Sequence, residues 1–163
     1  HAMSASLQQF ACWALHNLTS NNTENQRKAG AAGCIQHIER VMAQHQENEP
    51  VQQQACKAVN CILENEANLS VPRLAGCTRQ VMLAIKRFLL VADIQIDALE
   101  ILSVISQDDA SRKVAEGEGC IEHILHSMKE HQDNAGVQSA GCLALKAMAL
   151  SNPGNQVRAG RMN

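Results

Sequence analysis

The chain has 163 residues, a formal net charge of −2 at pH 7, and a composition that is 45% hydrophobic but only 2% aromatic. A membrane-spanning helix needs about 18 or more apolar residues in succession. Since charged residues interrupt even the longest apolar run, from residue 81 to residue 92, the sequence argues against membrane insertion. Basic residues occur at most in pairs, which argues against nucleic acid as the main partner.

After residues 1–3, interpreted as a cloning remnant, the first predicted element is a long helix from residue 5 to residue 20. Its apolar residues recur at i, i+4, i+7, i+8 and i+11, which makes one stripe of an α-helix. The members of this stripe are Leu7, Ala11, Ala14, Leu15 and Leu18. A short helix over residues 24–29 follows, with Thr23 as its predicted N-cap. Gly30 and Gly33 are expected to end that helix and turn the chain.

A medium helix is predicted from residue 34 to residue 42, followed by a polar linker over residues 46–50. Pro50 suits the first turn of the next long helix. That long helix repeats the first stripe, and so do two later segments, with starts at residues 7, 51, 94 and 137. A helical unit that returns at this fixed period predicts an all-α solenoid, in which each repeat is buried by its neighbours.

The later units keep the same order of elements, with one departure. Pro72 falls where the second unit should have its short helix, so we expect that helix to be bent or rebuilt. The apolar linker over residues 89–93 is expected to be nearly continuous with the helices on either side. The third unit has predicted helices over residues 111–116, 120–130 and 136–150. Residues 152–154 should stop the last of these, and residues 155–160 mirror residues 25–30.

The seven cysteines fall mostly at repeat-equivalent positions. One set comprises Cys12, Cys56 and Cys142; another comprises Cys34, Cys77 and Cys120, each directly after a glycine. A cysteine that recurs at one site of successive repeats acts as a small buried hydrophobe, so we predict structural thiols and no metal or cofactor. Cys61 stands apart and is predicted to be the cysteine that faces the groove described below. The odd number of cysteines and the absence of a signal peptide favour an intracellular setting, cytoplasmic or nuclear.

The unit of short helix, glycine turn, medium helix and long helix resembles the armadillo repeat, and the resemblance covers residues 5–163. Residues 11–18, with Trp13 and Asn17 four positions apart, resemble the most typical form of that repeat's third helix. The two-helix HEAT repeat, of similar period, is the alternative. The resemblance implies a right-handed superhelix with inner repeats over about residues 22–64, 65–107 and 108–151. A further repeat begins over residues 152–163, and we expect the chain to be a fragment of a longer array.

The armadillo resemblance also implies that the third helices line a concave groove that binds a partner polypeptide. The residues assigned to this groove are Gln9, Trp13, His16, Asn17, Ser20, Gln53, Lys57, Asn60, Glu64, Glu100, Ser103, Gln107, Ser139 and Lys146. A tryptophan offers contact area and a cation–π face, while an asparagine amide offers both a donor and an acceptor to a peptide backbone. The groove row is neutral overall and suits a segment of mixed charge.

Other functions are weaker interpretations of the same residues. Importin-alpha-like members repeat the Trp/Asn pair, but the positions that match Trp13 hold Lys57, Glu100 and Leu143, which argues against binding of a nuclear-import signal. His123 and His126 lie three residues apart without a companion metal motif. There is no phosphate-binding loop, so we predict that the segment is not an enzyme. The alternative to partner binding is a spacer within a larger protein, such as a kinase or GTPase. The apolar faces of Leu7, Phe10 and Ala11 and of the final helices are expected to be exposed and to cause weak self-association.

Overall fold

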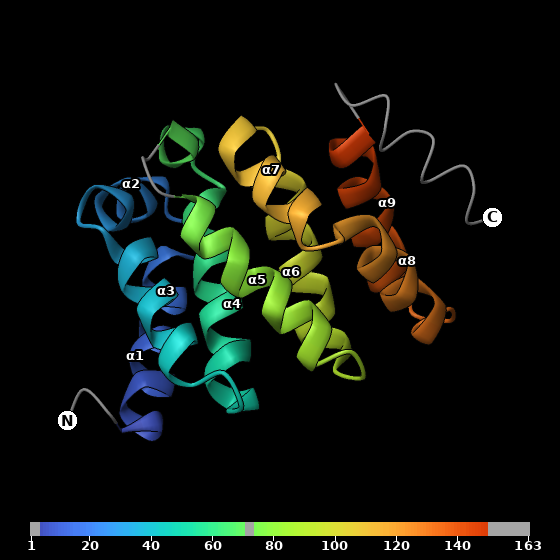
Figure 1. Ribbon diagram of the computed structural model, residues 1–163. Helices are drawn as coiled ribbons and strands as arrows, with labels where there is room; N and C mark the ends of the chain where they lie inside the picture. Colours follow the sequence, from blue (N-terminus) through green and yellow to red (C-terminus); the bar gives the residue numbers. More distant parts are fainter. Residues whose placement is uncertain (1–3, 71–73, 150–163) are drawn as a thin grey trace.

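The computed structural model describes residues 4–70 and 74–149. Within these ranges the chain forms α-helices and one 3-10 helix, with no strand, so the predicted all-α solenoid is confirmed (Figure 1). The elements are α1 (Ala5–Thr19), α2 (Thr23–Ala31), α3 (Cys34–Gln44), α4 (Glu49–Leu63), η1 (Glu66–Ser70), α5 (Leu74–Arg87), α6 (Ala92–Ile105), α7 (Asp109–Gly117), α8 (Cys120–Glu130) and α9 (Ala135–Ala149). No described helix is long and apolar enough to span a membrane.

The helices stack in two layers. The third helices of successive units, α1, α4, α6 and α9, each pack against the next and form one layer. The second helices, α3, α5 and α8, also pack in succession and form the other layer, as Figure 1 shows. The short first helices α2 and α7 lie at the upper edge of the molecule in this view. Each unit is therefore buried by its neighbours, as a solenoid requires.

The ends of the short and long helices follow local hydrogen-bonding rules. The N-cap of α2 is Asn22, whose Oδ1 accepts a hydrogen bond from the Asn25 N–H at 3.0 Å; the prediction of Thr23 as the cap was wrong by one residue. Three other helices are capped in the same way: α4 by Asn48, α7 by Asp108 and α9 by Asn134. Pro50 lies in the first turn of α4, as predicted.

Two glycines turn the chain between the first and second helices. Gly33 and Gly119 have φ angles of 75° and 73°, a left-handed conformation that side chains disfavour. Gly30, in contrast, lies inside α2 and does not end it. A Cβ added at Gly30 would lie 1.8 Å from the Asn68 Oδ1, so this glycine permits the close approach of the next unit. The prediction that Gly30 ends the helix was wrong for this reason.

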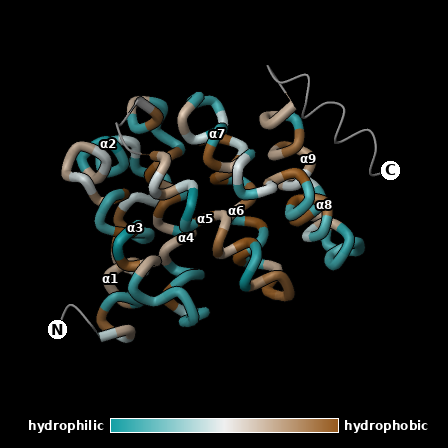
Figure 2. The backbone as a smooth tube through the Cα atoms, viewed as in Figure 1, coloured by the Kyte–Doolittle hydropathy of each residue, from teal (hydrophilic) through white to brown (hydrophobic). Residues whose placement is uncertain are grey.

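The second unit is rebuilt, as its sequence predicts. The five-residue 3-10 helix η1 stands where the other units have the nine-residue helices α2 and α7. Pro72 itself lies outside the described residues, as do residues 152–160. The linker expected to be nearly continuous with its neighbours is instead a turn over residues 88–90, and Val91 is the N-cap of α6. This loop is hydrophobic in Figure 2, whereas the loops after α3 and α8 are hydrophilic.

The predicted apolar stripes form the core in the inner units. Val51 and Ile62 on α4, for example, are fully buried. On α1, however, the matching residues Leu7 and Leu18 are 49% and 62% exposed, and the exposure of Leu7 agrees with the expectation of an open apolar face at this end. The face of α1 that packs on α4 consists instead of Gln8, Cys12, Leu15 and Thr19. In α4 the stripe is enclosed because both α1 and α3 pack against that helix.

A glutamine joins the second and third helices in every described unit. The Gln95 amide donates from Nε2 to the backbone oxygens of Ile85 at 3.1 Å and Phe88 at 2.8 Å. Gln52 does the same for α3, and Gln138 does it for α8. Carbonyls in the last turn of a helix have no partner within that helix, so this repeated side chain caps the second helix and fixes the third helix against it.

Candidate functional site

The predicted groove residues all lie on, or directly after, the third helices. We call the surface that they share the third-helix face; its residues are Gln9, Trp13, His16, Asn17, Gln53, Lys57, Asn60, Glu64, Glu100, Ser103, Gln107 and Lys146, with Ser20 and Ser139 at its margin. None of them is buried. Repeat spacing thus brings side chains from residue 9 to residue 146 onto helices that pack side by side.

At the α1 end of this face, aromatic side chains stand open to solvent. Trp13 is 52% exposed and Phe10 is 60% exposed. Together with Gln9 and Gln54 they line a recess of about 220 Å³. Sequence reasoning assigned Trp13 and Gln9 to the site but treated Phe10 only as part of an apolar end. Asn17, one helical turn after Trp13, is also exposed. An aromatic pair beside amides can contact both the apolar stem and the polar head of a bound residue.

Between α1 and α4, and between α4 and α6, the face is joined by polar contacts across the helices. His16 Nδ1 lies 3.3 Å from Cys61 Sγ. Asn60 donates from Nδ2 to Glu100 Oε2 at 2.6 Å. These contacts hold the side chains in defined positions, which lowers the entropy cost of ordering them when a ligand binds.

Two aspartates that sequence reasoning missed, Asp93 and Asp97, lie beside these contacts. Asp93 accepts a hydrogen bond from Gln53 Nε2 at 2.9 Å and lies 3.8 Å from Lys57 Nζ. Burial raises the pKa of the neighbouring Asp97 to about 6; nearby Lys57 opposes this shift, and Glu100 adds to it. The third-helix face is therefore acidic over α4 and α6 rather than uniformly neutral.

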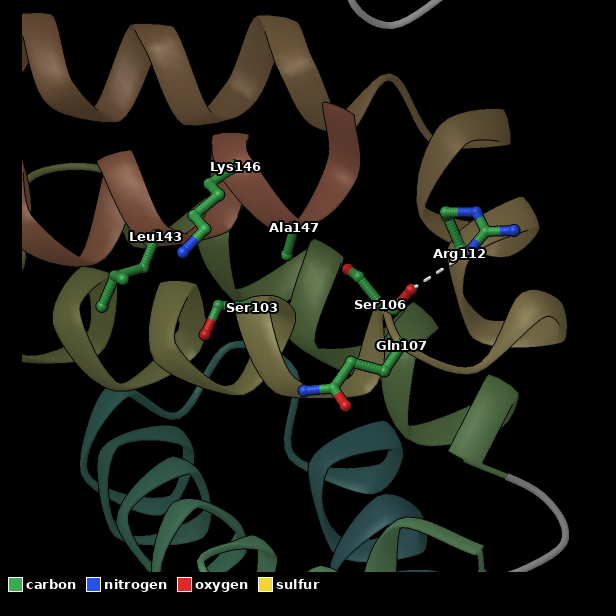
Figure 3. A pocket seen from close by; sticks show the side chains of 7 residues that line it. All are labelled: Ser103, Ser106, Gln107, Arg112, Leu143, Lys146 and Ala147. Carbon is green, nitrogen blue, oxygen red and sulfur yellow. Dashed lines mark hydrogen bonds between the residues drawn. The ribbon is translucent and has the colours of Figure 1, made fainter. Parts of the chain in front are cut away.

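The face is hollowed between α6 and α9. Figure 3 shows this cleft, which has a volume of about 480 Å³. Its lining residues are Ser103, Ser106, Gln107, Arg112, Leu143, Lys146 and Ala147. Ser103, Gln107 and Lys146 were predicted. Arg112 was missed because it comes from α7, a first helix, and the groove row was drawn from third helices alone. Nothing in the sequence around Arg112 indicated that it lines this cleft.

The cysteines lie largely where repeat equivalence predicts. Cys12, Cys56, Cys77 and Cys120 are buried, and Cys34 is half-buried. Burial raises the pKa of the Cys77 thiol to about 12. One expectation was wrong, because Cys142 is exposed. Cys61 is buried on α4, with its Sγ against His16 of the third-helix face. Cys56 is covered by α6, and Leu99 by α9; within the described chain, α9 has no later third helix to cover Cys142.

The histidines noted in the sequence do not converge with other ligands. No group of three or more His, Cys, Asp or Glu side chains that could hold a metal ion occurs within residues 4–70 and 74–149. His123 is half-buried on α8, in the layer opposite the third-helix face. Desolvation, followed by the positive charge of Lys86, lowers the pKa of His123.

Comparison with known proteins agrees with this geometry. A family model described as "LRRK2 ARM repeat" matches residues 1–160. No curated protein and no solved structure matches the chain. The armadillo repeat is a non-catalytic, three-helix repeat, and the first helices α2 and α7 distinguish this unit from the two-helix HEAT alternative. Because the match spans nearly the whole chain, this protein belongs to the armadillo-repeat family described as the LRRK2 ARM repeat.

Proposed function

We propose that this chain is a non-catalytic interaction module that binds an extended partner polypeptide along the third-helix face. The observation that carries the proposal is the row of ordered polar side chains that crosses from helix to helix, next to the exposed Trp13. Solenoids use such extended surfaces for binding. A row of donors and acceptors at the spacing of successive third helices can satisfy the backbone amides of an extended chain.

The two ends of the face supply different contacts. At α1, the recess beside Trp13 and Phe10 suits an aliphatic or aromatic side chain. Over α4 and α6, Asp93 and Glu100 suit a basic or amide side chain. Trp13 is the candidate for the largest single contribution, since tryptophans are frequent hot spots at protein interfaces. Lys57 and Glu100 set partner preference more than affinity, as charges near the rim of an interface do.

The competing function is a spacer or regulatory solenoid within a larger protein, in which the same face is only solvated surface. The seven free thiols suit a reducing compartment, and we place the module inside the cell, in the cytoplasm or the nucleus. A nuclear-import adaptor is disfavoured because the Trp13 and Asn17 pair is not repeated on α4, α6 or α9.

The test is selection of peptides from a displayed random library against the whole chain, followed by measurement of each enriched peptide by fluorescence anisotropy. Affinity that falls in Trp13→Ala and stays unchanged in Arg40→Ala, an exposed position on α3, would support the proposal. Enriched peptides whose affinity is indifferent to the third-helix face would favour the spacer.

A further inference from the structure

The cleft between α6 and α9 differs in charge from the rest of the third-helix face. Two cationic side chains, Lys146 from α9 and Arg112 from α7, line it. Figure 3 shows the Lys146 amine directed over the cleft toward Ser103. The neighbouring stretch of the face carries Asp93, Asp97 and Glu100. The face therefore carries carboxylates along the first part of α6 and the Lys146 ammonium beside its last part, although the chain as a whole has a net charge of −2.

The two cations differ in how they are held. The Arg112 guanidinium donates from Nη1 to the Ser106 carbonyl at 3.4 Å and pairs with Asp109, and its Nε lies 3.9 Å from Glu116. It is thereby fixed at the wall of the cleft, with its side chain 16% exposed. Lys146 is exposed and forms no ion pair with any residue of the described chain. Its charge is available to a ligand.

The remaining lining residues define what else the ligand must carry. Leu143 and Ala147 present apolar surface on α9. Gln107 is exposed at the mouth and offers an amide donor. The Ser103 hydroxyl also lines the cleft, and its proton is already engaged because it donates to the Glu100 carbonyl at 2.7 Å. A side chain with a short apolar stem and an anionic head would match this arrangement of apolar wall, amide and ammonium.

We propose that this cleft is the subsite for an anionic side chain of the bound polypeptide, a carboxylate or a phosphate, held by the Lys146 ammonium near Ser103 and Leu143, with Arg112 fixed at the opposite wall. The inference rests on the proposed function for its ligand. An anion placed between α4 and α6, outside the cleft, would be repelled by Asp93, Asp97 and Glu100. The position of the anionic residue thus fixes the register and direction of the polypeptide along the face.

The subsite is tested with small probes that do not require the partner. The ¹⁵N-labelled chain is titrated with N-acetylglutamate N-methylamide, with the corresponding phosphoserine derivative, and with the uncharged glutamine derivative. Saturable shifts at the Ser103, Gln107 and Leu143 amides are expected with the anionic probes and not with the glutamine derivative. Lys146→Gln should weaken the binding about fivefold, the upper end of what an exposed ion pair contributes. Lys129→Gln, an exposed control on α8, should not.

The outcomes separate this inference from the proposed function. Tighter binding of the glutamate probe identifies a carboxylate ligand, and tighter binding of the phosphoserine probe identifies a phosphorylated one. Equal shifts with the glutamine derivative, or binding unchanged in Lys146→Gln, would overturn the subsite. Because no probe reaches Trp13, these results are independent of the peptide selection. A peptide that depends on Trp13 but not on Lys146 would leave the proposed function standing and remove the subsite.

Discussion

Replacement of Gln95 by leucine should destabilise the solenoid through one identifiable loss. Gln95 is fully buried, and its Nε2 satisfies two carbonyls at the end of α5. Leucine is similar in size but offers no donor, so the buried Ile85 carbonyl loses its partner, and the Phe88 carbonyl keeps only the bond from the Val91 N–H. Together these losses cost roughly 2–3 kcal/mol. The Oε1 atom of the same amide is buried without a hydrogen-bond partner in the described chain, and its removal offsets part of that cost. The expected net loss is about 2 kcal/mol.

The assay is urea unfolding followed by circular dichroism at 222 nm, with Gln44→Leu as the matched control. Gln44 is exposed at the end of α3, and such surface substitutions usually change stability by less than about 0.5 kcal/mol. Gln138→Leu should cost less than Gln95→Leu, because Gln138 is only half-buried. If Gln95→Leu were as stable as the parent chain, the idea that this amide joins the second and third helices would be refuted.

Three further predictions concern the thiols, the pH dependence and the α1 surface. Ellman titration of the native chain should modify Cys142 first and Cys34 next, while the buried thiols react only after unfolding; rapid modification of Cys77 would contradict the structure. Because the raised pKa of Asp97 makes the folded chain bind its proton more tightly, stability should fall as pH rises from about 4 to about 6 and then level off. Asp97→Asn should remove this dependence and add about 1–2 kcal/mol at pH 7.5, after allowance for partial exposure; unchanged urea midpoints at every pH would refute it. The exposed Leu7, Phe10 and Leu18 should drive weak association at millimolar concentration, reduced in Leu18→Glu; a strictly monomeric sedimentation profile would count against it.

Repeat spacing was enough to predict the fold. Four copies of one apolar stripe located all the third helices to within a residue or two, since each inner copy meets the same neighbours. On α1 the same stripe is open, as expected for an apolar end, because Leu7 and Leu18 lack the covering helices that enclose Val51 and Ile62. Repeat equivalence failed at Cys142, which is exposed because no later third helix of the described chain covers it. A periodic pattern identifies which face is apolar, but burial depends on what packs against that face.

The candidate site was predictable only in part. The position of its residues on the third helices follows from the repeat period, which brings Trp13, Asn60 and Lys146 to one layer. Arg112 could not be found in this way, because its contribution depends on the hydrogen bond that carries its guanidinium from α7 to the Ser106 carbonyl, just after α6. Asp97 was missed because its sequence position is that of Gln54 on α4, which carries no charge. The glutamine at residues 52, 95 and 138 recurs at the repeat period and could have been noticed, but its bonds depend on where the second helices end.

The central claim is that the third-helix face binds a polypeptide, and the affinity of a selected peptide for Trp13→Ala tests it most directly. Truncation of a tryptophan hot spot costs roughly 2 kcal/mol or more, so the peptide should bind about 30-fold more weakly than it binds the parent chain. Asn17→Ala should cost about 1 kcal/mol through lost hydrogen bonds. An affinity that ignored Trp13, Asn17, Lys57 and Glu100 together, within the error of the Arg40→Ala control, would contradict the account and leave the solenoid as a spacer.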